Sequence, residues 1–187
     1  MSGGAPLDPD PVTLLFRHVV RQRVRTLFPA RRHVLEITGS GLDTVGLAPA
    51  GLEVHTFDPS TASPDVGSLR DLDGAFAGPG ALEGAELTAV GRALAVALRP
   101  GAPVLLCVGP RRAERIRLRE ARARLGPDLV WRSAFALGVI VPDESAQEWV
   151  RGHPQAFGVL AAVEGLVRRW PLLRARGEFT VIEGARR

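Results

Sequence analysis

Two small groups of residues in the first third of the chain could bind a ligand. One is the turn Gly39-Ser40-Gly41, which follows an apolar run containing Glu36, and the other is Asp58, which ends the next apolar run. Glycines let a backbone approach a ligand closely, and a helix that begins after such a turn offers free N–H groups to an anion. A carboxylate at the end of the neighbouring strand can accept hydrogen bonds from both hydroxyls of a ribose. Together, the turn, the strand before it and Asp58 are compatible with nucleotide binding.

The same residues also have structural explanations. Glu36 could cap the following helix or pair with an arginine, and Asp58, which precedes Pro59, could serve only to form a turn. A Gly-Ser-Gly turn is weak evidence of nucleotide binding when it stands alone. These residues by themselves leave both interpretations open.

The elements that would position these residues alternate along the chain. Apolar residues at three- and four-residue steps predict helices over residues 11–28, 42–49, 83–98, 113–125 and 155–170. Short apolar runs between turn residues predict strands over residues 33–37, 52–57, 74–78, 103–108 and 179–182. This alternation predicts an α/β fold with a doubly wound, mostly parallel sheet. Residues 60–68 lack apolar periodicity and are expected to form an irregular connection that leaves the second strand at the sheet edge.

Length and composition predict a single domain. The 187 residues are 45% hydrophobic, which is enough for one substantial core. Residues 1–10 are expected to be a flexible N-terminus, and residues 131–154 an irregular segment that resembles a lid. The start of the chain lacks the pattern of a secretory signal, and no stretch approaches the roughly 18 consecutive apolar residues of a membrane span. We therefore expect a cytoplasmic protein without a membrane span.

The charged and metal-ligating residues point to no further site. All 24 basic residues are arginine and the net charge is +4, but the densest cluster, over residues 111–124, is interrupted by acids and is interpreted as a solvated helix face. An RNA-binding or RNA-modifying protein that uses that helix remains an alternative, and nucleic acid is not the favoured partner. The single cysteine and the four histidines show no metal-ligand spacing, so Cys107 is interpreted as a buried apolar residue and the histidines as structural.

Several segments resemble the class I S-adenosylmethionine-dependent methyltransferases, in particular a bacterial subgroup. Residues 34–41 look like that family's first motif, residues 73–78 resemble its fourth strand, residues 94–108 resemble the run into its fifth, and residues 137–179 resemble its ending. The resemblance covers nearly the whole chain. It implies a Rossmann-like methyltransferase fold and S-adenosylmethionine as the cofactor. The cofactor-binding residues that it implies are Glu36, Thr38, Gly39, Ser40, Gly41, Asp58, Ser68, Leu69, Ala77 and Gly78.

The chain is shorter than that family's pattern in one place. Few residues separate Asp58 from Gly67-Ser68-Leu69, where the family has a helix and a third strand, and Ser68 stands where an acid often holds the adenine. We therefore expect a sheet that lacks one edge strand and its helix. The resemblance implies a methyltransferase acting on a small molecule, and the alternative is a non-catalytic relative that acts as a partner or scaffold. An exposed sheet edge would also allow a homodimer or a heteromeric partner.

Overall fold

The structure is a computed structural model that describes residues 11–29, 32–38, 51–59, 68–109, 118–140, 147–168, 170 and 177–187. Its centre is one sheet of six strands in the order β2-β1-β3-β4-β6-β5. The strands are β1 (His33–Ile37), β2 (Glu53–Phe57), β3 (Gly74–Ala77), β4 (Pro103–Val108), β5 (Leu129–Leu137) and β6 (Phe179–Arg186). In the described part of the chain β2 is an edge strand, as the sequence predicted.

The strands β1, β2, β3 and β4 run parallel to one another. Strand β6 lies between β4 and β5 and is antiparallel to both. Strand β5 therefore runs in the direction of β4, so the carboxyl ends of five strands meet at one edge of the sheet. We call this the carboxyl edge. The doubly wound, mostly parallel sheet predicted from the sequence is confirmed.

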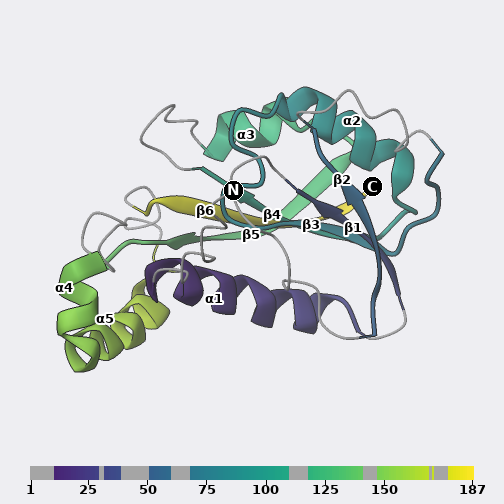
Figure 1. Cartoon of the computed structure of the whole chain (residues 1–187). Helices are drawn as coiled ribbons and strands as arrows, with labels where there is room; N and C mark the ends of the chain where they lie inside the picture. The colour runs from purple at the N-terminus through teal and green to yellow at the C-terminus, as the bar shows by residue number, and fades with distance from the viewer. Residues whose placement is uncertain are drawn as a thin grey trace, which may run out of the picture.

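Helices cover both faces of the sheet (Figure 1), α1 (Pro11–Leu27) on one face and α2 (Leu87–Ala97) and α3 (Leu118–Arg124) on the other. Helix α1 buries residues at four-residue steps, since Val12, Phe16, Val20 and Val24 are each no more than 4% exposed. Two apolar clusters, one on each face of the sheet, form the core. The sheet is thus a middle layer between helices, which accounts for the nearly continuous burial of β1, β3, β4 and β6.

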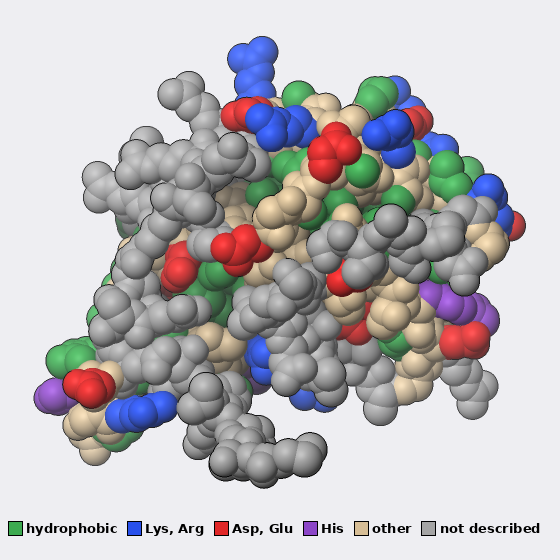
Figure 2. All heavy atoms as spheres, turned by 45° about the horizontal axis from the view of Figure 1, so that its top comes forward, with side chains coloured by type: hydrophobic (Ala, Val, Ile, Leu, Met, Phe, Trp, Pro, Cys, Tyr) green, Lys and Arg blue, Asp and Glu red, His purple; other side chains and the backbone are tan. Residues whose placement is uncertain are grey.

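Close packing joins α2 to α3. A Cβ built at Gly91 would overlap the backbone carbonyl of Leu125, so no larger residue fits at that position without moving the two helices apart. On the outer surface of these helices the charges pair locally, with Arg124 lying 2.6 Å from Glu120 on α3. Figure 2 shows charges of both signs mixed with apolar side chains on this side of the molecule. For residues 118–124, this arrangement agrees with the predicted solvated helix face, while residues 111–117 of that cluster lie outside the described residues.

Two further helices, α4 (Gln147–Gly152) and α5 (Pro154–Val167), lie beside one end of the sheet, next to α1 (Figure 1). A side chain of α5 attaches it to the chain that follows β5. The Glu164 carboxylate accepts hydrogen bonds from the N–H of Val139, at 3.0 and 3.1 Å, and of Ile140, at 2.8 Å. Glu164 is the only charged residue of α5 and is 3% exposed. Helix α5 is therefore tied to the carboxyl edge by buried hydrogen bonds.

The predicted irregular segment over residues 131–154 is wrong in its first part. Residues Leu129–Leu137 form β5, and residues of α4 fall at the end of the same range. A bulge between Trp131 and Ser133 breaks the alternation of buried and exposed residues, and the last four residues of β5 are all buried. Neither half of β5 therefore shows the two-residue period of an exposed strand.

Other boundaries differ less. Strand β6 continues to Arg186, beyond the predicted end at residue 182, since Arg23 and Ser133 satisfy the polar side chain of Glu183 inside the strand. Helix α2 begins at Leu87 rather than at residue 83. The predicted helix over residues 42–49 and all but the last residue of the predicted loop over residues 60–68 lie outside the described residues. None of the helices in the described part has both the length and the apolarity that crossing a bilayer requires.

Candidate functional site

Three residues named from the sequence follow the carboxyl ends of adjacent strands. Thr38 follows β1, Asp58 follows β2 and Gly78 follows β3. The parallel register pairs Ile37 with Phe57, and the Thr38 N–H donates to the Phe57 carbonyl at 2.8 Å, so the ends of β1 and β2 are level. The sheet thereby brings these three residues to the same edge. In open α/β sheets this edge is where ligands bind, especially beside a change of strand direction or order.

A buried carboxylate lies on β1, two residues before Thr38 and therefore close to the carboxyl edge. Glu36 on β1 is 7% exposed, and its Oε1 has no hydrogen-bond partner among the described residues. It pairs in register with Phe76 on β3, which is fully buried. Burial raises the pKa of Glu36 from 4.5 to about 7. Such a group gains from any cation placed against it, because the cation would restore the charged form that burial disfavours.

The explanations left open for Glu36 are not separated by the described residues, because the helix that it could cap lies outside them. Within the described part of the chain its Oε1 has no hydrogen-bond partner. A buried polar atom left without a hydrogen bond costs about 1–3 kcal/mol. Ligand binding by Glu36 therefore stays a prediction.

The other predicted residues divide into three groups. Ala77 is fully buried as the last residue of β3, directly before Gly78, and it completes the group at the carboxyl edge. Ser68 and Leu69 lie in the chain that leads into the amino end of β3, with Ser68 exposed and Leu69 packed on the core. Their expected role near an adenine stays a prediction. The turn Gly39-Ser40-Gly41 lies outside the described residues.

Residues at the same edge that the sequence did not single out are Gly109 and Glu164. Gly109 follows β4 with φ +139°, and a Cβ there would lie 2.8 Å from the Glu178 carbonyl, so the position requires glycine. Glu164 holds the segment after β5 at this edge. Its signal in the sequence was a single acid within an otherwise uncharged, apolar helix, since such an acid needs a buried partner.

No protein-family model and no curated protein sequence matches this chain. Solved structures do resemble it. A geranyl diphosphate methyltransferase in complex with SAM is 11% identical, with a TM-score of 0.52 over 98% of this chain and 93% of that chain. The geranyl diphosphate C-methyltransferase from Streptomyces coelicolor A3(2) is 9% identical, with a TM-score of 0.52 over 98% of this chain and 88% of that chain.

A third structure, of a geranyl diphosphate methyltransferase in complex with GPP and sinefungin, is 10% identical, with a TM-score of 0.53 over 98% of this chain and 85% of that chain. At such low identity a structural likeness establishes the fold and not the activity. The fold predicted from the sequence motifs is confirmed by it: the chain has the α/β fold of the class I S-adenosylmethionine-dependent methyltransferases.

Proposed function

We propose that this protein is an S-adenosylmethionine-dependent methyltransferase that acts on a small molecule. The observation that carries the proposal is the buried Glu36 carboxylate, whose Oε1 has no partner within the described chain and whose pKa is raised to about 7. S-adenosylmethionine carries an ammonium group on its methionine part. Because Glu36 lies just behind the carboxyl edge, that ammonium is the kind of partner the carboxylate needs.

The remaining residues fit the rest of the cofactor. Asp58 ends β2 at the same edge and would accept hydrogen bonds from the ribose hydroxyls, while Ala77 and Gly78 offer a buried, small-residue wall beside it. The turn Gly39-Ser40-Gly41 would accommodate the methionine carboxylate through its backbone. Ser68 and Leu69 would border the adenine. When bound, the cofactor supplies a methyl group activated by a sulfonium centre.

The chain's own contribution to such a reaction would be mainly positioning and exclusion of water. Methyl transfer from a sulfonium needs little acid or base assistance, so placing the acceptor in line and removing solvent can supply most of the rate increase. Glu164 supports this role, since it ties α5 to the segment that follows β5 at the carboxyl edge. The three similar structures described above are of geranyl diphosphate methyltransferases, which supports a small molecule as the class of acceptor.

A second candidate function is that of a non-catalytic relative that acts as a partner or scaffold. The observation in its favour is that β2 is an edge strand in the described sheet, so no third strand flanks the adenine side there. A cytoplasmic location and a homodimer through the β2 edge are proposed under either function. An edge strand with free backbone groups is a natural place for a second copy to pair.

Calorimetric titration with S-adenosylhomocysteine separates the two functions. We expect the unmodified protein to bind this product, and Glu36→Gln to bind it at least tenfold more weakly. The matched control is Glu120→Gln, an exposed acid on α3, which should bind as the unmodified protein does. Absence of binding by the unmodified protein would favour the scaffold function. Equal binding by the Glu36→Gln variant would remove Glu36 from the site.

A further inference from the structure

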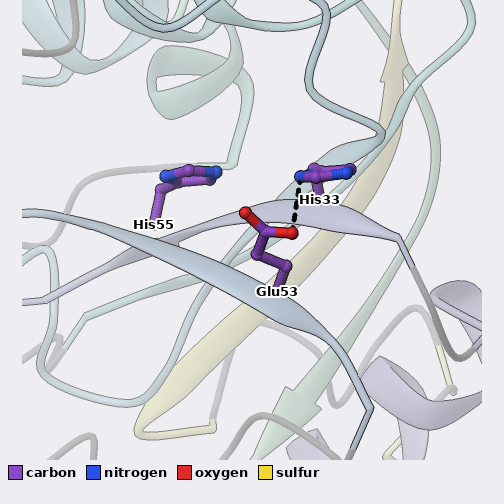
Figure 3. A group of neighbouring side chains, drawn as sticks. All are labelled: His33, Glu53 and His55. Atoms are coloured by element: carbon purple, nitrogen blue, oxygen red, sulfur yellow. Dashed lines mark ion pairs between the residues drawn. The ribbon is translucent and has the colours of Figure 1, made fainter.

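Two histidines and a glutamate that are separate in the sequence gather on one face of the sheet edge. His33 begins β1, and Glu53 and His55 lie on β2. Figure 3 shows the Glu53 carboxylate between the two imidazole rings, with all three side chains on the same side of the two strands. One ligand atom from each residue lies within 4.8 Å of the others. We call these residues the β1–β2 cluster.

The distances suit a transition metal. His33 Nδ1 lies 3.2 Å from Glu53 Oε2. Two ligands at the usual distance of about 2.0–2.1 Å from a tetrahedral Zn²⁺ are themselves about 3.3 Å apart. His33 and Glu53 therefore already have the spacing of two ligands of a tetrahedral zinc ion. Rotation of the His55 side chain would supply the third ligand.

The backbone holds the cluster in place. The ladder pairs His33 with Glu53 and Leu35 with His55, so the three ligands are neighbours by register. The His33 N–H donates to Asp73 Oδ2 at 3.0 Å, and Arg99 lies 2.7 Å from the other oxygen of Asp73. Ligands that sit on paired strands with a fixed backbone need little reorganisation to bind an ion.

We propose that the β1–β2 cluster binds a divalent first-row transition metal of the zinc type. Two imidazoles and one carboxylate are ligands that such ions accept, while Mg²⁺ and Ca²⁺ prefer all-oxygen sites. Three protein ligands leave a fourth position for water or for a ligand from outside the chain. The site is accessible, because the side chains of His33 and Glu53 are 55% and 64% exposed.

The metal would not take part in chemistry at the carboxyl edge. His33 is the first residue of β1 and Thr38 follows its last, so five residue steps of about 3.3 Å separate them, or roughly 16 Å. The role that fits this position is to tie β2, the edge strand, to β1. This inference therefore stands independently of the proposed methyltransferase function.

The competing explanation is a simple ion pair between His33 and Glu53, with His55 stacked nearby at a ring separation of 6.3 Å. An ion pair of this kind involves no metal and gives His55 no essential part. Titration of the full chain, without a histidine tag, with Zn²⁺ and with Mg²⁺ in a calorimeter distinguishes the two. A second titration, with Co²⁺, reports tetrahedral coordination by its visible absorption.

We expect Zn²⁺ to bind with one equivalent and to raise the melting temperature, and Mg²⁺ to do neither. His33→Gln and His55→Gln should each weaken Zn²⁺ binding at least tenfold. The control His18→Gln, an exposed histidine on α1 that contacts Gln22, should bind as the unmodified protein does. Circular dichroism should confirm that all three variants are folded.

Three results would overturn the proposal. The first is that the unmodified protein fails to bind Zn²⁺, and the second is that it responds equally to Mg²⁺. The third is that His18→Gln loses as much affinity as His55→Gln, since binding would then be spread over surface histidines.

Discussion

Glu36 on β1 pairs in the parallel ladder with Phe76 on β3, so an acidic side chain and a fully buried aromatic side chain are neighbours in the sheet. The Glu36 side chain is largely removed from water, since it is 7% exposed. Burial raises the pKa of Glu36 to about 7 for this reason. The consequences can be measured on the protein without a ligand and with one.

Glu36→Gln should stabilise the protein at neutral pH. A carboxyl whose pKa rises from 4.5 to about 7 on folding holds a proton in the folded state that the unfolded state has lost, so the free energy of unfolding falls as pH rises through that window. The amide of the Glu36→Gln variant does not titrate, so its contribution to the free energy of unfolding does not change with pH. The difference in the free energy of unfolding between the variant and the unmodified protein should therefore shift by about 1–3 kcal/mol in the variant's favour on going from pH 4.5 to pH 8. Denaturant unfolding at both pH values measures this, and parallel pH profiles would contradict it.

Binding of S-adenosylhomocysteine should strengthen as pH rises through 7. Glu36 must be ionised to accept the ligand's ammonium, and its pKa of about 7 means that the free protein must lose a proton on binding below that pH. Affinity should rise between pH 6 and pH 8 and then level off. Titrations in buffers with different ionisation enthalpies should show proton release at pH 6, and the pH dependence should disappear in Glu36→Gln.

Asp58→Asn should weaken binding of S-adenosylhomocysteine without lowering the melting temperature. Asp58 follows β2 at the carboxyl edge and is only half-buried, so we expect the neutral amide to be tolerated there. Loss of a charged hydrogen-bond partner of two hydroxyls costs about 1.5–3 kcal/mol, or roughly ten- to hundredfold in affinity. Asp71→Asn, an exposed position before β3, is the control. An equal fall in affinity and melting temperature would indicate a structural role for Asp58.

The adenine should contribute less to binding than its apolar area allows. In the described sheet no strand flanks β2 on its outer side, and an unburied aromatic base forfeits roughly 1–3 kcal/mol. S-adenosylhomocysteine and S-ribosylhomocysteine, which lacks the base, should therefore bind with affinities within about tenfold. A strong preference for the intact nucleoside would show that another part of the chain or a second copy covers the base.

Gly91→Ala should destabilise the fold, whereas Gly165→Ala should not. A Cβ at Gly91 would overlap the Leu125 carbonyl, a backbone atom that cannot turn aside, and overpacking of this kind costs about 1–3 kcal/mol. At Gly165 in α5 a Cβ meets nothing within 4 Å, so alanine should add about 0.5–1 kcal/mol through helix propensity. Thermal unfolding of the two variants checks the contrast, and equal melting temperatures would contradict it.

Local patterns in the sequence were sufficient for most of the elements. The buried strands β1 and β4 are short apolar runs, and α1 has a regular apolar face, so neighbouring residues alone determine their type. These strand boundaries placed Glu36 near the end of β1 and Asp58 directly after β2. Because parallel strands share a carboxyl edge, the sequence also determined that these two residues lie at the same end of the sheet.

Only the tertiary structure decided which strands pair and which distant side chains become neighbours. The place of β6 between β4 and β5 depends on pairing between residues far apart in the chain, which no local pattern encodes. The same holds for Glu164, whose buried carboxylate meets backbone N–H groups of another segment. The β1–β2 cluster is the clearest case. His33 and His55 are 22 positions apart in the sequence, and the parallel pairing of β1 with β2 brings them close together.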